Sequence, residues 1–208
     1  MEVYGTKPKK FTKEWWSYFW MYYKWHTIAI LFAAAIITTS AVQCAQSPKY
    51  DLQADFITET FFSDEQKAAL EQLMCDNIDD ASGNDKKEAF VLNLNMVQSE
   101  DVQMNQAMQT KFFLEQGYSE SYVFIGSENY IDWLASAEIF VPASDWAQGE
   151  EGNYASLAGC TALEDIGIDT SDLYIAVRSM REKDAEKEYQ VHQYENGIKF
   201  AQFLVGKR

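Results

Sequence analysis

Few residues of this chain combine into a pattern that could catalyse a reaction. The chain has only two histidines. His192 is spaced four residues from Glu188 and three from Glu195, which favours a solvated helix face over a catalytic base. No glycine-rich phosphate loop and no Gly-x-Ser-x-Gly nucleophile turn occurs. We therefore expect a protein that is not an enzyme and that uses no cofactor.

Cysteines and acidic residues supply the remaining redox and metal-binding candidates. Cys75 and Cys160 could form a disulfide outside the cytoplasm or remain free thiols. The acidic stretch 76–85 has the composition of a calcium-binding turn. No register within it combines alternate ligands with glycine at the sixth position. A solvated turn without metal is the favoured interpretation, and a calcium site is the alternative.

Three aromatic residues could stack on a sugar ring or another flat ligand. Trp133 follows Tyr130 by three positions, which places both on one helix face and favours core packing for Trp133. Trp146 and Tyr154 lie in a stretch without clear periodicity. These two residues are therefore the better binding candidates.

The elements that must position these residues follow an alternating order. We expect strands at 50–56, 90–96, 122–125 and 173–177, helices capped by Ser63, Ser99 and Ser127, a loop at 149–159, and a closing helix at 186–205 interrupted near Asn196 and Gly197. Strand, helix, strand, helix is typical of parallel sheets with right-handed crossovers. The predicted fold is an α/β domain with a three- to five-stranded, mostly parallel sheet and flanking helices.

Polar residues at the expected strand ends form a second candidate site. Ligands of open parallel sheets bind beyond the carboxyl ends of the strands, where helix N-termini present free N–H groups. The residues at these ends are Thr58 and Glu59, then Gln98, then Ser127 and Glu128. Serine caps explain part of this pattern equally well.

The charge of the chain is strongly negative and unevenly distributed. The formal net charge is −15, which argues against nucleic acid as a partner because phosphates would repel the protein. Residues 1–26 nevertheless carry five lysines against two glutamates. Most of the acidic residues follow the apolar run that begins at residue 25.

That apolar run has the length of a membrane span. Residues 25–48 include no charged side chain, and a helix of this length would extend about 36 Å, enough for a hydrocarbon core of about 30 Å. Aromatic residues crowd positions 15–25 and precede it, as in membrane-interface belts. The predicted organisation is a cytoplasmic basic and aromatic segment at 1–24, a transmembrane helix at 25–45, and an extracytoplasmic domain at 46–208.

Two other interpretations of the N-terminal region remain open. A cleavable signal peptide could be cut after Thr39-Ser40-Ala41, although 26 residues with many bulky rings precede the apolar core. A lipoprotein would use Cys44, but Gln43 occupies a position where a small residue is preferred. An uncleaved single-pass anchor with a cytoplasmic N-terminus is the favoured interpretation, because the lysines precede the span.

Several segments resemble the first lobe of extracytoplasmic solute-binding proteins. They are Met108-Gln109-Thr110-Lys111, Tyr122-Val123-Phe124-Ile125, Ser136-Ala137-Glu138-Ile139-Phe140 with Val141-Pro142, and 173–178. The segment Tyr22-Tyr23-Lys24-Trp25-His26 resembles the start of the span in a group of uncharacterised, membrane-anchored proteins of Gram-positive bacteria. The resemblance implies one lobe of an α/β fold and an association with solute or peptide binding.

Two functions follow as hypotheses. The first is a non-catalytic, membrane-tethered module that docks a membrane or envelope protein. The second is a lobe that binds a solute or peptide for a transport or sensing system. A single lobe offers little concavity for a small ligand, which favours the first hypothesis. The expected partners are the lipid bilayer and a protein, with a small-molecule ligand as the alternative.

Overall fold

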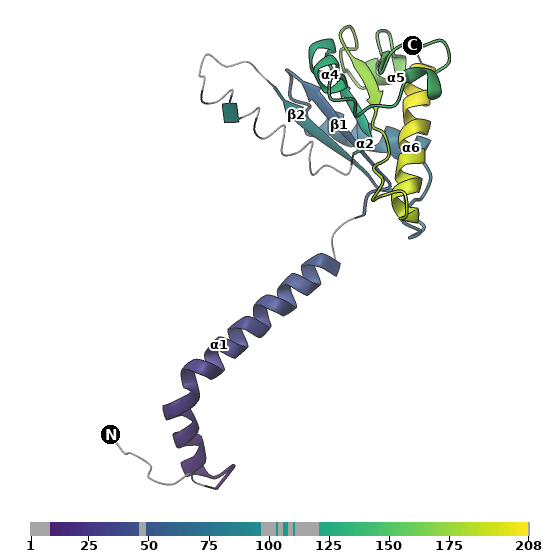
Figure 1. The fold of residues 1–208 in the computed structure, drawn as a ribbon. Coiled ribbons are helices and arrows are strands. Elements are labelled where there is room, and N and C mark those ends of the chain that lie inside the picture. The colour runs from purple at the N-terminus through teal and green to yellow at the C-terminus, as the bar shows by residue number, and fades with distance from the viewer. Residues whose placement is uncertain are drawn as a thin grey trace. The chain divides into compact units, whose positions relative to one another are not determined.

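The computed structural model describes residues 9–45, 49–96 and 121–207, together with residues 103, 106, 107 and 110. The contacts of the chain divide it into two compact units, residues 1–48 and residues 49–208. The helices and strands of both units are labelled in Figure 1.

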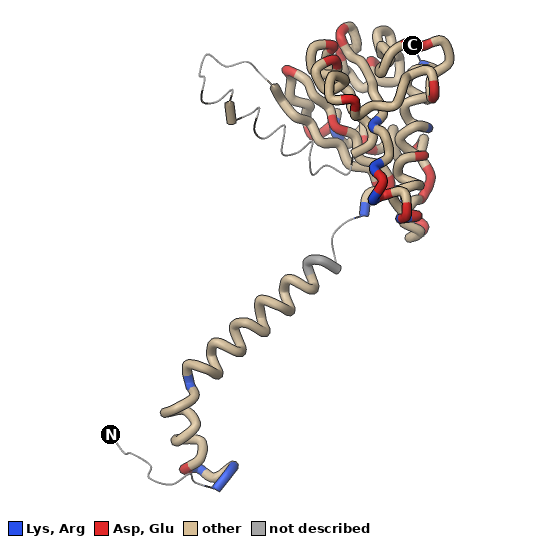
Figure 2. Tube along the Cα trace, viewed as in Figure 1, with Lys and Arg blue, Asp and Glu red and all other residues tan. Residues whose placement is uncertain are grey.

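The first unit contains one long helix, α1, from Lys13 to Ala45. At about 1.5 Å per residue its 33 residues extend about 50 Å. The stretch Lys13–Val42 is long and apolar enough to cross a membrane, and none of its most apolar window is buried against other parts of the protein. Figure 2 shows lysines at the start of α1 and a long uncharged stretch after Lys24.

The second unit is built on a five-stranded mixed sheet with the order β2-β1-β3-β5-β4. The strands are β1 (Leu52–Thr58), β2 (Ala89–Asn95), β3 (Val123–Gly126), β4 (Ala155–Ser156) and β5 (Tyr174–Val177). Strand β1 runs parallel to both β2 and β3. The predicted α/β fold is present, and its three central strand assignments match the expected segments within two residues.

The expectation of a mostly parallel sheet holds for two of the four strand pairs, β1 with β2 and β1 with β3. Strand β5 is antiparallel to both β3 and β4. Tyr174, the first residue of β5, pairs with Gly126, the last residue of β3. A parallel neighbour would require the chain to return to the start of β3. The connection instead enters the sheet at the edge where β3 ends, so β5 runs in the opposite direction.

Helices cover both faces of this sheet. They are α2 (Asp64–Asn77), α4 (Glu128–Ala135), α5 (Thr161–Glu164) and α6 (Glu188–Val205), with a short 3-10 turn, η1, at Ala143–Asp145. One apolar cluster joins the sheet to α2, α5 and α6, and it includes Phe56, Leu70 and Phe200. A second cluster joins the other face to α4 through Phe124 and Ile131. Figure 1 shows α6 and α4 on the two sides of the strands.

The helix starts differ in how well they are capped. Ser63 forms the predicted capping box, because its Oγ accepts from the Gln66 N–H at 3.1 Å and Gln66 Oε1 accepts from the Ser63 N–H at 3.0 Å. Ser127 stands at the N-cap of α4, but its side chain makes no capping hydrogen bond. The predicted cap Ser99 and the helix after it lie outside the described residues.

Two further expectations about local structure are corrected. Helix α6 is continuous through Asn196 and Gly197. A Cβ at position 197 would lie 3.3 Å from Tyr122 Cβ and 3.3 Å from Val123 Cγ2, so this glycine permits close packing of α6 on β3 rather than a break. The stretch expected as a loop at 149–159 contains strand β4. Two residues are too short to produce a clear alternation in the sequence.

Candidate functional site

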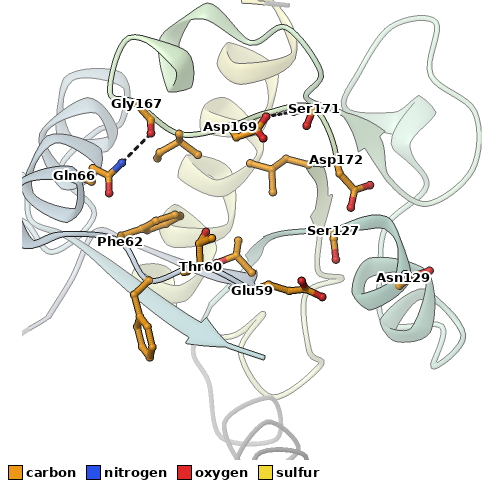
Figure 3. Close-up of a pocket in the computed structure, with 14 residues that line it drawn as sticks. Glu59, Thr60, Phe62, Gln66, Ser127, Asn129, Gly167, Asp169, Ser171 and Asp172 are labelled. Atoms are coloured by element: carbon orange, nitrogen blue, oxygen red, sulfur yellow. Dashed lines mark hydrogen bonds between the residues drawn. The ribbon is translucent and has the colours of Figure 1, made fainter. Parts of the chain in front are cut away.

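A cavity of about 470 Å³ opens at the carboxyl ends of β1 and β3. Its walls come from three segments that are distant in the sequence: residues 58–62 with Gln66, residues 127 and 129, and residues 167–169 with 171–173. Figure 3 shows these segments around a common space, with Glu59 and Ser127 on one side and Asp169 on the other. We call this cavity the strand-end pocket.

The sheet topology explains why these segments meet. Parallel neighbours end at the same edge, so Ile57 of β1 lies beside Gly126 of β3. The antiparallel strand β5 begins at that edge, which brings the loop before Tyr174 to the same place. The approach is close, because a Cβ at Gly126 would lie 2.7 Å from the Ile57 carbonyl oxygen. A larger residue at position 126 would push β1 and β3 apart beneath the pocket.

Thr58 is a lining residue of the pocket that is almost fully buried and holds the turn after β1. Only 7% of Thr58 is exposed. Its hydroxyl donates to the Thr60 carbonyl oxygen at 2.8 Å and accepts from Asn93 Nδ2 at 3.0 Å. The Thr58 carbonyl oxygen accepts from the Met96 N–H at 2.9 Å. These bonds fix the turn that follows β1 and thereby place Glu59 and its neighbours.

Gln66 connects the two sides of the pocket. While its Oε1 completes the capping box with Ser63, its Nε2 donates to the Gly167 carbonyl oxygen at 2.8 Å. One side chain therefore holds both the start of α2 and the loop that precedes β5. This bond is drawn as a dashed line in Figure 3.

The described lining of the pocket is acidic. Glu59, Asp169 and Asp172 contribute carboxylates, and Lys, Arg and His are absent from the lining residues. The N–H of Ser171 donates to Asp169 Oδ1 at 3.0 Å. This N–H and the Ser171 hydroxyl lower the pKa of Asp169, because they stabilise its carboxylate form. The pocket therefore favours a cationic group or a hydrogen-bond donor over an anion.

Aromatic side chains border the same pocket. Phe62 turns inward and meets Phe56 edge-to-face, with ring centroids 5.2 Å apart. Phe61 turns outward and is 78% exposed. A large exposed ring beside a cavity supplies apolar contact area for a partner. Trp133 was expected in the core but is 40% exposed, and it lies one helical turn from the pocket residue Asn129.

The predicted site residues divide into three groups. Thr58, Glu59 and Ser127 line the pocket together. Glu128 is exposed in the first turn of α4, outside the pocket lining. Gln98 lies outside the described residues. Residues at the ends of the first and third strands therefore line one cavity, and their role in binding stays a prediction.

The two aromatic candidates lie elsewhere. Trp146 is only 3% exposed and belongs to the core cluster, so the expectation that it contacts a ligand is wrong. Tyr154 packs edge-to-face on Tyr174 at 5.5 Å. Burial, followed by the carboxylates of Asp132 and Glu128, raises the pKa of Tyr154. Tyr154 is thus held between β5 and α4, outside the lining of the strand-end pocket.

The cysteine, histidine and calcium candidates also acquire defined surroundings. Cys75 and Cys160 are free thiols, and burial raises the pKa of each, which disfavours the reactive thiolate. His192 is exposed on α6, with Nδ1 3.2 Å from Glu195 Oε2. Within the described part of the chain no three His, Cys, Asp or Glu residues are grouped as metal ligands.

The acidic turn at 76–85 is organised by its own backbone. The N–H groups of Gly83 and Asp85 each donate to an Asp80 carboxylate oxygen at 2.7 Å. Burial acts to raise the pKa of Asp80, but these hydrogen bonds lower it overall. Asp51 is buried and accepts from the N–H groups of Ala81, Ser82 and Glu88. These contacts give the stretch the geometry of a closed turn.

Sequence reasoning missed the third wall of the pocket. Asp169 and Asp172 precede a strand, and the strand-end rule applied to a parallel sheet looks only at residues that follow one. The antiparallel direction of β5 brings its beginning to the binding edge, and no local pattern indicates that direction.

Comparison of the chain with protein-family models, curated proteins and solved structures gives no match.

Proposed function

We propose that this chain is a single-pass membrane protein whose domain at 46–208 lies outside the cytoplasm and docks a membrane or envelope protein at the strand-end pocket. The observation that carries the proposal is the pocket itself, a cavity of about 470 Å³ with three carboxylates and an exposed phenylalanine. The role is one of binding, without catalysis.

The membrane part of the proposal is supported by α1. This helix is long and apolar enough to cross a membrane, and it carries no charged side chain after Lys24. Aromatic residues and lysines stand at its beginning. Lysines next to a span are retained on the cytoplasmic side. The proposed topology therefore has the N-terminus in the cytoplasm and the acidic domain on the other side.

The charge of the pocket supports a basic segment of a protein as the docked group. The N-termini of α2 and α4 each contribute about half a positive charge near this edge. Glu59, Asp169 and Asp172 together exceed that contribution, so an anionic ligand is disfavoured. A lysine or arginine of the partner would pair with these carboxylates, while Phe61 would contact its apolar neighbours.

The proposal is tested with the full chain in its native membrane. Brief chemical cross-linking, detergent extraction and affinity purification recover bound proteins, which mass spectrometry identifies. We expect the double variant Glu59→Arg with Asp172→Arg to lower partner recovery about tenfold, equivalent to about 1.4 kcal/mol of binding free energy. Both residues are exposed, so the domain should remain folded.

The matched control reverses two carboxylates elsewhere on the surface, Glu182→Arg with Glu186→Arg. These residues are exposed and do not line the pocket. Equal recovery of a partner by the parent protein and the pocket variant would refute docking at this site. Equal loss in both double variants would show that overall charge, rather than the pocket, governs binding.

The second candidate function is binding of a solute or peptide by this solute-binding-protein-like lobe. Its support is the size of the cavity, which lies within the range of about 300–1,000 Å³ found for small-molecule sites. The side chains of Gln66 and Asn129 add polar groups to the lining. A thermal-shift screen with sugars and short peptides separates the two functions, because a ligand of the native state raises the melting temperature.

A further inference from the structure

We propose that residues 9–25 bind the headgroups of anionic phospholipids at the cytoplasmic membrane surface. This inference rests on the proposed membrane insertion of α1 and adds a lipid class to it. It is independent of what the strand-end pocket binds. Its basis is the length of α1, the distribution of its side chains around the helix, and their charge.

Helix α1 is longer than a membrane core requires. The uncharged part from Trp25 to Ala45 extends about 31 Å, which matches a hydrocarbon core of about 30 Å. Residues 13–24 continue the same helix for about a further 18 Å. They must therefore lie in the headgroup layer and the water next to it, where lipid headgroups are their neighbours.

This extension carries a ladder of aromatic rings and two lysines. Trp15, Phe19 and Tyr23 form a ladder of stacked rings at four-residue spacing, with successive centroids 5.4 Å and 5.8 Å apart. Lys13 and Lys24 are eleven residues apart, close to three full turns, and so share a face. At 100° per residue this face is centred about 130° from the ladder. Trp20 is four residues before Lys24 and seven after Lys13, so a ring and the two ammonium groups share this face.

Few acidic side chains are close in the sequence to these lysines to compensate their positive charge. Lysines outnumber acidic residues between residue 9 and the end of α1, where Lys9, Lys10, Lys13 and Lys24 are accompanied by one carboxylate, Glu14. Figure 2 shows the basic positions near the start of α1. The Lys24 ammonium lies 5.6 Å from the centre of the Trp25 ring. Helical side chains point toward the N-terminus, so Lys24 extends from the edge of the core toward the phosphates.

Charge complementarity then selects the lipid. A cytoplasmic leaflet rich in anionic lipid attracts juxtamembrane lysines by about 1 kcal/mol each, or about fivefold in association. Tryptophan and tyrosine rings prefer the headgroup depth, which keeps the lysines at the height of the phosphates. A zwitterionic headgroup has no net charge to complement, so we expect selection of phosphatidylglycerol over phosphatidylcholine.

Fluorescence quenching by brominated lipids measures this selection with the full chain. Four of the six tryptophans lie in the proposed segment, at positions 15, 16, 20 and 25. The protein is reconstituted in phosphatidylcholine nanodiscs that contain brominated phosphatidylglycerol or brominated phosphatidylcholine at equal mole fraction. We expect stronger quenching by the anionic lipid, corresponding to at least a fivefold preference.

The test variant replaces four lysines by glutamine, K9Q/K10Q/K13Q/K24Q, and should bring the preference close to one. The control variant K86Q/K87Q/K183Q/K207Q removes four exposed lysines of the second unit and should retain the parent preference. Soluble glycerol phosphate added in excess should not reduce it, because the binding surface is the bilayer.

The outcomes separate this inference from the proposed function. Equal quenching by both brominated lipids would overturn the lipid preference while leaving insertion intact. An absence of quenching by either lipid would show that α1 does not enter the bilayer, and the proposed membrane anchor would fail as well. Loss of the preference in the control variant would assign it to the second unit instead of residues 9–25.

Discussion

Helix α1 and the second unit use large apolar side chains in opposite ways. In α1 these side chains face outward, as in Ile30 and Phe32, which are both 68% exposed. In the second unit most of them are enclosed by the sheet and its helices. Among its described residues, only Phe61 and Trp133 are large hydrophobics with high exposure.

This difference shows that exposure has meaning only relative to the surroundings of each unit. A uniformly apolar exposed helix matches a lipid environment. Two exposed rings on an otherwise enclosed core indicate a contact surface. Phe61 lines the strand-end pocket, so it is informative in a way that Ile30 is not. Substitutions at buried and exposed side chains of the two units test this difference.

The largest effect is expected from removing a ring of the enclosed core. Phe56→Ala should lower the free energy of unfolding by about 3–5 kcal/mol, because Phe56 is fully buried against Phe62. Phe61→Ala should change it by no more than about 0.5 kcal/mol. Urea unfolding of the full chain in detergent, monitored by near-ultraviolet circular dichroism, measures the free energy of unfolding of both variants. Similar losses in the two variants would remove the distinction between core and contact rings.

The second-largest effect is expected from a charge placed in the middle of α1. Ile30→Arg should cost about 2.5–3.5 kcal/mol of insertion free energy, because Ile30 lies within the apolar stretch of α1. The fraction of protein that resists alkaline carbonate extraction from membranes should fall accordingly. The same replacement at Phe61 should leave that fraction unchanged. An Ile30→Arg protein that stays fully membrane-bound would contradict the span.

Smaller effects are expected at the two helix starts of the sheet unit. Ser63→Ala should destabilise the fold by about 1 kcal/mol, since it removes the capping box of α2. Ser127→Ala should have a smaller effect, because its hydroxyl does not cap α4. Thermal unfolding of the two variants, compared side by side, checks the order. The reverse order would show that the Ser127 hydroxyl has a structural role.

The smallest effect is expected from pH at Asp184. Burial acts to raise the pKa of this carboxyl, but hydrogen bonds and charges from Lys187 and Arg181 lower it overall. A lowered folded-state pKa means that the stabilisation is present above the unfolded value near 4 and is lost as pH falls through the folded value. Unfolding curves of the parent and Asp184→Asn should therefore differ at pH 7 and converge in strong acid. A constant difference across this range would exclude the linkage.

The sequence by itself determined the features that depend on neighbouring residues. The charge-free run at 25–48 is sufficient to predict a helix long and apolar enough to cross a bilayer. Ser63 and Gln66 predict their own capping box, since both partners lie within one helical turn. Alternating residues indicated β1 and β2, and the rule for strand ends led to Glu59 and Ser127 in the pocket.

Only the tertiary structure decided the features that depend on distant residues. The direction of β5 is set by where the chain re-enters the sheet, and this direction brings Asp169 to the pocket. Trp146 is enclosed and Trp133 exposed, the reverse of what their local patterns favour. Periodicity reports which residues share a face, but the element that covers that face is chosen by packing between segments far apart in the chain.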